Sequence, residues 1–379
     1  MFLICRGKRL LLAAVALILS AVLVAGGCLL YGALAEEEKK DYIKWVDFNV
    51  PYAMLEKALT LDVDSHVKNE AVQFNWVELL AYTAARNGGN WSGVKTTKLD
   101  ELAALLRQGK TLEELTENLT YYSYYLEAYT AVLGGMVGPY EVQVKAENSE
   151  ELLWESRYGL IAFSPIAKNY PYSDYDDFGS SRDYGYKRKH LGHDLMGATG
   201  TPIIAVEGGT VEALGWNQYG GWRIGIRSFD KKRYYYYAHL RQNFPYQKEL
   251  REGSVVLPGD VIGYLGHTGY SANENVNNIR QPHLHFGIQL IFDESQKEGN
   301  NEIWIDCYNI VRLLRRHQSE VVKNTETKDY SRIYDIRPAG SPDRYTPENA
   351  PDPLSGDTPD GQSGQNDQQV DSSEGVSGG

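Results

Sequence analysis

The sequence predicts an α+β protein, in which an N-terminal membrane-spanning helix and a small helical domain precede an antiparallel β-sheet domain. Residues 10–35 carry no charged side chain, and residues 42–138 repeat apolar side chains at helical spacing. After residue 186 short alternating runs are separated by Gly and Pro, which is typical of antiparallel strands. We therefore expect a helical domain over 36–138 and a β-rich domain over 186–320.

Composition excludes some classes of protein. A chain of 379 residues with 42% apolar residues can form two modest domains. Its net charge of -12 argues against a nucleic-acid partner, because such a footprint is normally basic. Cys307 is the only cysteine after residue 28, so no disulfide framework is expected in the body, and metal ligands there must be His and Asp.

The N-terminus predicts the compartment. Residues 1–9 form a basic flank, and the uncharged stretch that follows has 26 residues, longer than the 7–15 typical of a secretory signal and sufficient for a span of about 20. We expect a single-pass signal anchor at the cell membrane, with the body outside the cytoplasm. Cleavage after Ala35, which would secrete the protein, is the alternative. A lipoprotein signal ending at Cys28 is a weaker one, because apolar residues follow that cysteine.

The helical region shows three apolar stripes. They lie over 71–86, 99–106 and 112–133, and Thr111 with Glu114 forms a candidate capping box before the third. We interpret the stripes as core-facing helices of a domain that could dock an envelope protein. Residues 139–185, rich in aromatic, acidic and turn-forming residues, are expected to form a connector.

Short strands are expected in the β-rich domain. Strands are predicted over 202–206, 261–265 and 284–291, a hairpin over 222–228 and 233–240, and a helix over 309–318. Residues 321–337 form a C-terminal extension, and 338–379 are predicted to be a disordered acidic tail because they contain very few apolar residues.

Histidines are concentrated in this domain: six of eight lie between residues 190 and 285. Strand alternation over 282–291 places His283 and His285 on one face and four apolar side chains on the other. The same alternation over 233–240 places His239 on the face of Tyr235 and Tyr237.

A metal site follows from the residue types. His190 and Asp194 share a face in a strand or a helix, and Gly192 between them disfavours a regular helix. Together with one histidine of the later pair they supply three ligands, which is the number that a catalytic zinc site takes from protein. Zinc lowers the pKa of its water to about 7, and the remaining histidines can then act on that water and on the developing oxyanion.

Residues 185–292 resemble the lysostaphin/LytM-type zinc endopeptidases, which cut peptides of bacterial peptidoglycan. The matching motifs are HLGHD at 190–194, GTP at 200–202, YAHL at 237–240, GD at 259–260, GHTG at 266–269 and PHLHF at 282–286. The resemblance implies a small antiparallel sheet with zinc in a groove. It also implies that His190, Asp194 and His285 are the metal ligands, and that His239 and His283 are the catalytic pair that activates water and stabilises the tetrahedral intermediate.

Two features depart from the family. Residues 270–281 form a longer polar loop than the short Ser-Thr-Gly segment of many relatives, and Gly287 stands where relatives often carry an acidic residue. Two further histidines stand apart: His193 should point away from the metal ligands, and His267 lies in a Gly-rich turn that either lines the groove or lies on the surface.

The predicted function is zinc-dependent hydrolysis of cross-links or stem peptides of peptidoglycan. The alternative is a catalytically silent envelope scaffold, or a protein of the same fold that activates another hydrolase. Such proteins typically lose a ligand, whereas this sequence retains the complete set.

Overall fold

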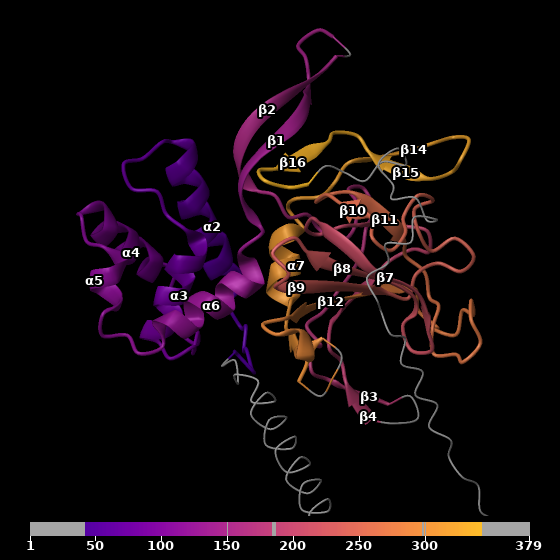
Figure 1. The fold of residues 1–379 in the computed structure, drawn as a ribbon, viewed down its shortest axis with the longest axis horizontal. Coiled ribbons are helices and arrows are strands. Elements are labelled where there is room, and N and C mark those ends of the chain that lie inside the picture. Colours follow the sequence, from indigo (N-terminus) through magenta and orange to yellow (C-terminus); the bar gives the residue numbers. More distant parts are fainter. Residues whose placement is uncertain (1–41, 150, 184–186, 298, 300, 343–379) are drawn as a thin grey trace, which may run out of the picture.

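The computed structural model describes residues 42–149, 151–183, 187–297, 299 and 301–342, and it consists of a helical bundle beside a β-rich half (Figure 1). The predicted anchor at 10–35 and nearly all of the predicted disordered tail lie outside the described residues. Within those ranges, no helix combines the length and apolar character needed to cross a membrane.

Five helices form the bundle. They are α2 (Tyr52–Val67), α3 (Trp76–Arg86), α4 (Thr97–Arg107), α5 (Leu112–Thr116) and α6 (Tyr122–Leu133). Asn75 caps α3 by accepting from the backbone N–H groups of Val77 and Glu78, and the Thr111 side chain caps α5 through the N–H of Glu114. The buried side chains of α2, α3, α4 and α6 share one core.

The single helix expected over 112–133 is wrong, because the chain breaks between α5 and α6. The Thr116 hydroxyl donates to the carbonyl of Leu112 at 2.7 Å, and a turn closes from Leu119 N–H to the carbonyl of Thr116 at 2.8 Å. Residues 116–120 read Thr-Glu-Asn-Leu-Thr, in which Thr and Asn compete for backbone hydrogen bonds. The regular spacing of apolar residues over 112–133 therefore gave no sign that the polar residues at 116–120 separate two helices.

The segment expected to be a connector contains a long hairpin. Strands β1 (Val137–Lys145) and β2 (Leu152–Leu160) pair antiparallel along their full length, and β16 (Ile336–Pro338) adds to the outer edge of β1. Figure 1 shows this hairpin projecting beyond the two halves. The alternating Tyr140, Val142 and Val144 are the signal that sequence interpretation overlooked.

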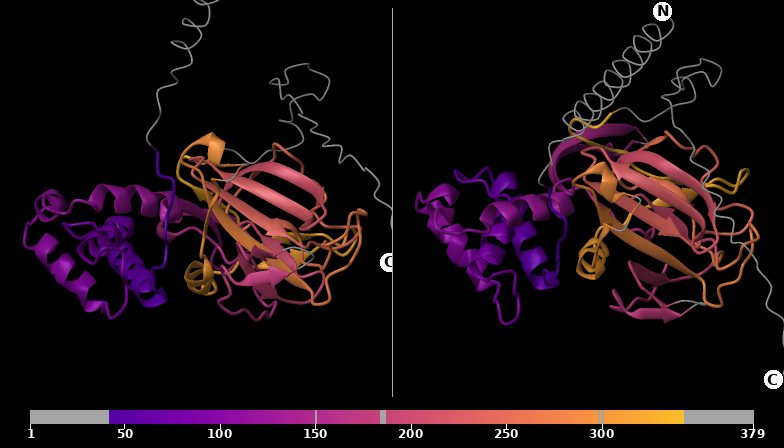
Figure 2. Two further views of the ribbon diagram at one scale, coloured as in Figure 1. Left: turned by 90° about the horizontal axis from the view of Figure 1, so that it is seen from below. Right: turned by 60° about the horizontal axis from the view of Figure 1, so that its bottom comes forward.

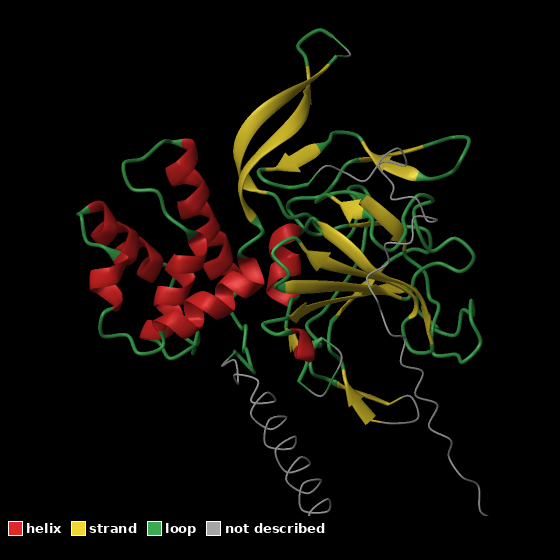
Figure 3. Ribbon diagram, in the orientation of Figure 1, coloured by secondary structure: helices red, strands yellow, loops and turns green. Residues whose placement is uncertain are grey.

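A seven-stranded antiparallel sheet dominates the β-rich half (Figure 3). Its order is β10 (Val255–Val256), β7 (Gly209–Asn217), β8 (Gly221–Ser228), β9 (Arg233–Ala238), β12 (His283–Leu290) and β13 (Ile303–Ile305), with β5 (His193–Met196) also pairing with β12. The predicted hairpin is confirmed as β8 and β9, in the register Ile224 to Tyr237.

Smaller elements complete this half. They are the pairs β3 (Ser181–Asp183) with β4 (Lys187–Lys189), β6 (Pro202–Ile204) with β11 (Val261–Tyr264) and β14 (Val321–Lys323) with β15 (Tyr330–Arg332), the 3-10 turn η1 (Glu294–Gln296) and helix α7 (Tyr308–Leu314). Helix α7 lies between the bundle and the sheet (Figure 2). The predicted strand face is confirmed: Leu284, Phe286, Ile288 and Leu290 are all fully buried.

A buried arginine joins the bundle to the sheet. Arg233 is fully buried and donates to the carbonyl of Ala131 near the end of α6 at 2.7 Å. The same guanidinium forms ion pairs at 2.8 Å with Glu207 and Asp230. Gly135 permits this approach, since a Cβ there would lie 1.7 Å from Glu207 Oε1. The helical bundle is therefore packed onto the sheet through charged as well as apolar contacts.

Candidate metal centre

Three predicted ligands converge near the start of β12. Asp194 lies opposite His285 in the β5–β12 register, and His190 precedes β5 in an irregular segment, as the glycine at 192 suggested. His190 Nε2 lies 3.0 Å from Asp194 Oδ1 and 3.0 Å from His285 Nδ1, and His285 Nδ1 lies 2.9 Å from Asp194 Oδ1. This triangle of donor atoms could hold one metal ion.

Asp177, in the loop before β3, and Arg182, in β3, support the triangle, and sequence analysis missed both. Asp177 Oδ1 lies 3.1 Å from His190 Nδ1, on the side of the ring away from the triangle. Arg182 contacts Asp177 and places Nη2 3.1 Å from Asp194 Oδ2. Burial alone would raise the pKa of Asp194, but its hydrogen bonds with His190 and His285 hold that pKa well below its usual range. Asp194 is therefore ionised and oriented for a cation.

His239 reaches the site by a backbone turn that the sequence interpretation did not predict. Strict alternation placed it with Tyr235 and Tyr237, but those rings are fully buried in the core, whereas His239 lines the groove on the other side of the sheet. Strand β9 ends at Ala238, and His239 takes a φ of 62°. This left-handed conformation, uncommon for a residue with a side chain, redirects the imidazole toward β12.

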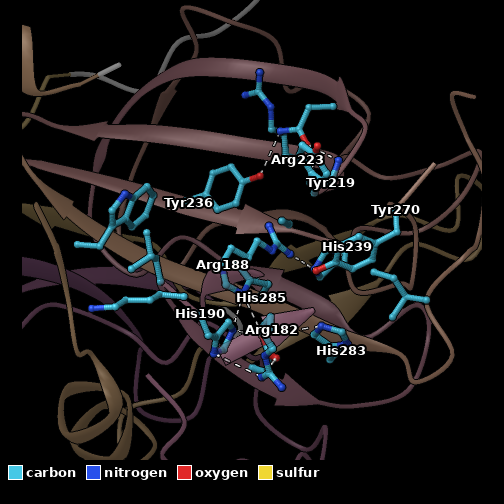
Figure 4. A pocket seen from close by; sticks show the side chains of 18 of the residues that line it. Arg182, Arg188, His190, Tyr219, Arg223, Tyr236, His239, Tyr270, His283 and His285 are labelled. Atoms are coloured by element: carbon cyan, nitrogen blue, oxygen red, sulfur yellow. Dashed lines mark hydrogen bonds and ion pairs between the residues drawn. The ribbon is translucent and has the colours of Figure 1, made fainter. Parts of the chain in front are cut away.

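His239 and His283 face each other beside the ligand triangle (Figure 4). Their ring centroids lie 4.8 Å apart, and His283 Nε2 is 3.8 Å from Asp194 Oδ1. The Nδ1 atom of His239 lies 3.0 Å from the Thr268 carbonyl, and that of His283 lies 2.7 Å from the Gln281 carbonyl. A carbonyl only accepts, so both Nδ1 atoms donate, and in a neutral His239 the Nε2 atom is left as an acceptor.

Burial controls the charge of His239 and His285. Desolvation lowers the pKa of His239 well below its usual value, and the neighbouring His283 and His285 lower it further. Burial also lowers the pKa of His285. Both rings are therefore neutral near pH 7, which suits a proton acceptor and a metal ligand.

The centre opens into a groove of about 1180 Å³. Its lining includes the side chains of Arg188, Tyr219, Arg223, Tyr236, Tyr270 and Trp304. Of the four consecutive tyrosines in β9, Tyr234 and Tyr236 face the groove and the other two face the core, as strand alternation requires. The groove thus has an aromatic floor and several cationic side chains.

The long polar loop of residues 270–281 forms one wall of this groove. Asn275 Oδ1 accepts from Trp222 Nε1 at 2.9 Å and from the Asn243 N–H at 2.8 Å. His267 Nδ1 lies 2.9 Å from the Ile279 carbonyl, so it anchors the loop and is not among the groove-lining residues. The departure from the family pattern is therefore a groove wall that these hydrogen bonds hold in place.

The position of Trp304 explains why residue 287 is a glycine. A Cβ at this position would lie 2.7 Å from Cζ3 of Trp304 and 3.2 Å from the Leu191 carbonyl oxygen. Trp304 stands edge to face with Tyr236, with ring centroids 6.0 Å apart. An acidic side chain at 287 and the present position of Trp304 are incompatible.

The remaining histidines lie outside the centre. His193 Nε2 pairs with Asp174 at 2.9 Å, away from the triangle as strand geometry predicted. His66, in the helical bundle, stacks on Tyr158 at 3.8 Å. All five predicted site residues lie together, and their individual chemical roles stay a prediction.

Comparison with known proteins agrees with the motifs. Residues 188–300 match the model of peptidase family M23, which confirms the resemblance. The chain is 35% identical over 159 residues to an L-Ala–D-Glu endopeptidase of Bacillus subtilis, covering 42% of this chain and 45% of that protein. It is 35% identical over 98 residues to lysostaphin of Staphylococcus simulans, covering 26% and 17%.

One solved structure, of a LytM protein from Ruminococcus gnavus, aligns with 70% of this chain and 88% of its own at 24% identity and a TM-score of 0.45. The chain spans less than half the length of the curated relatives named above.

Proposed function

We propose that this chain, whose residues 188–300 form a peptidase family M23 domain, is a zinc-dependent endopeptidase that hydrolyses peptides of bacterial peptidoglycan. The observation that carries the proposal is the convergence of His190, Asp194 and His285, with donor atoms about 3 Å apart, beside the His239–His283 pair. Several relatives are named as endopeptidases, which supports the reaction class.

The donor set fits zinc. Two imidazoles and one ionised carboxylate, without a thiolate, form the kind of three-ligand set that catalytic zinc sites use. His190 would bind through Nε2 and His285 through Nδ1. On its other side His190 Nδ1 lies 3.4 Å from the carbonyl oxygen of Asp177 and 3.1 Å from its carboxylate, and carbonyl and carboxylate partners of this kind orient metal ligands. When bound there, zinc supplies Lewis-acid polarisation of the scissile carbonyl and a lowered pKa for water.

His239 and His283 then carry out different parts of the proton transfer. His239 is neutral with Nε2 available, so it accepts a proton from water as general base. His283, held by the Gln281 carbonyl, donates to or stabilises the developing oxyanion, for which it must carry a proton on Nε2. The aromatic floor and the loop wall position the peptide against this pair.

We also propose a location and a partner. The uncharged residues 10–35 would anchor the chain in the cell membrane with the groove outside, where peptidoglycan lies. Cleavage after Ala35 would instead secrete it. The helical bundle, which carries no part of the centre, offers a surface for an envelope protein. No observation favours the silent scaffold, since the ligand set is complete.

Digestion of purified cell wall by the purified protein tests the proposal. We expect about one zinc per chain, release of new amino termini from the wall, and loss of both zinc and release in His285→Ala. Arg86→Gln, an exposed change in the helical bundle, serves as the control and should digest normally. Normal digestion by His285→Ala would overturn the proposal.

A further inference from the structure

One cation in the groove, Arg223, has a buried Nε atom without a hydrogen-bond partner among the described residues. Arg223 lies on β8, where Ile224 and Ile226 are fully buried in the core, so strand alternation turns the arginine toward the groove that it lines. Its Nε atom is buried without a hydrogen-bond partner, and no carboxylate of the described residues pairs with its guanidinium. A buried donor left unsatisfied is costly, which indicates a ligand that completes it.

Three other cations that line the groove are already engaged. Arg182 pairs with Asp177 and Asp194, and Lys297 pairs with Glu212 at 2.7 Å. Arg188 lies 5.6 Å from the ring centroid of Tyr219 and 5.2 Å from that of Tyr270. Arg223 therefore stands apart from these three in lacking a counter-charge or a ring.

The space beside Arg223 is open. Gly215 lies opposite Arg223 in the β7–β8 register, and a Cβ on Gly215 would meet nothing within 4 Å. In Figure 4, Arg223 and Tyr219 lie at one end of the groove and His190 and His283 at the other, with Tyr236 between them. A ligand seated on the Tyr236 ring can therefore reach Arg223 without moving the chain.

The sheet fixes the distance from the reaction centre. Arg223 is on β8, His239 follows β9, and His283 and His285 are on β12, so two strand spacings separate the arginine from His283 and from the metal ligand His285. Neighbouring strands lie about 4.8 Å apart, which places Arg223 about 10 Å from β12. An extended peptide advances about 3.3 Å per residue, so a group bound at Arg223 lies about three residues from the scissile bond.

We propose that Arg223 binds a carboxylate of the substrate peptide, so that the groove selects acidic stem peptides over uncharged ones. A guanidinium donates two parallel hydrogen bonds to a carboxylate, and such charged bonds are stronger than neutral ones. This inference rests on the proposed function for the identity of the ligand as a wall peptide, and it adds the class of peptide and the residue that selects it.

Binding measured without turnover tests the inference. The probes are stem peptides released from cell wall, with their carboxyl groups free or converted to amides, titrated into the zinc-loaded His239→Ala protein. We expect the free acids to bind about 10- to 100-fold more tightly than the amides. Arg223→Gln in the same background should abolish this preference, and Arg223→Lys should retain part of it. The control Arg86→Gln should leave it unchanged.

Each outcome separates the two proposals. If the His239→Ala protein binds the free acids and the amides equally tightly, the inference is overturned, and this result is conclusive without measuring an Arg223 variant. A preference that survives Arg223→Gln overturns the role of Arg223. If the unaltered protein fails to cleave the acids while His239→Ala still prefers them, the proposed function fails and the carboxylate site stands. Cleavage of acids and amides at equal kcat/KM supports the function and overturns the selectivity.

Discussion

The Nδ1 atom of His239 lies 3.0 Å from the carbonyl oxygen of Thr268, and this contact secures a histidine whose φ is 62°. Thr268 is fully buried, and its hydroxyl donates to the carbonyl of Leu240 at 2.6 Å, so it holds the chain on the far side of the histidine as well. The neighbouring GHTG and YAHL motifs therefore work as one unit that directs Nε2 of His239 into the groove.

His239→Ala should retain zinc and lose hydrolysis. The three donor atoms of the triangle come from other residues, so metal affinity should change little. Loss of a general base typically lowers kcat by about 10²- to 10⁴-fold. Metal content by atomic absorption and release of amino termini from cell wall measure the two effects separately. A protein that loses its zinc with this substitution would show that His239 is itself a ligand.

Stability of the metal-free protein should depend on pH through the buried histidines. His239 and His285 have pKa values lowered by burial, so below about pH 6.5 the unfolded chain binds protons that the folded protein does not. Their contribution to the free energy of unfolding is fully present above about pH 6.5 and declines as pH falls toward the folded pKa. Urea denaturation across this window should show a decline of up to about 1.4 kcal/mol per pH unit for each histidine.

His239→Ala supplies the comparison for this pH dependence. It removes one of the two lowered groups, so its free energy of unfolding should fall less steeply below about pH 6.5. An identical slope in the two proteins would mean that His239 is protonated equally in the folded and unfolded states. Asp194, whose pKa is held low, acts in a separate and more acidic window.

Asp177→Asn should weaken zinc binding while leaving the ligands in place. Asp177 Oδ1 lies 3.1 Å from His190 Nδ1, and partners of this kind typically contribute about 10- to 100-fold to metal affinity. Competition with a zinc chelator measures the change. Asp335→Asn, in the extension after the β-rich domain, alters a carboxylate remote from these ligands and should leave affinity unchanged. Equal affinities in Asp177→Asn and the unaltered protein would contradict the assigned role.

The sequence predicted the positions of site residues correctly on regular strands, and less well where the backbone is irregular. Alternation along one strand with a buried apolar face was sufficient to place His283 and His285 together, because period two is fixed by strand geometry. The same rule failed at His239, where a left-handed residue ends the alternation. Asp177 and Arg182 come from a segment without periodicity, and only the folded chain brings them to His190 and Asp194.

Gly287→Ala should destabilise the sheet by displacing Trp304. The new Cβ would lie 2.7 Å from the indole ring, and overpacking of this kind typically costs about 1–3 kcal/mol. The cost should be smaller when Gly287→Ala is introduced into a Trp304→Ala background, because the ring is then absent. Urea denaturation of the four proteins measures this coupling. Additive effects would show that the glycine serves a purpose other than making room for Trp304.

Arg233→Met should destabilise the contact between the helical bundle and the sheet. The guanidinium is fully buried among Glu207, Asp230 and the Ala131 carbonyl, and removal of one partner leaves a charge unpaired in a buried site. Breaking a buried ion pair typically costs about 3–5 kcal/mol. We expect a loss of that size in the free energy of unfolding, measured by urea denaturation.

A second change distinguishes the lost ion pair from lost packing. Adding Glu207→Gln to Arg233→Met removes the stranded carboxylate, so the double variant should be more stable than Arg233→Met alone. Arg86→Met, an exposed change on α3, controls for the loss of one positive charge and should fall within about 0.5 kcal/mol of the unaltered protein. If Glu207→Gln gives no recovery, packing of the arginine stem against α6, rather than its charge, holds the two halves together.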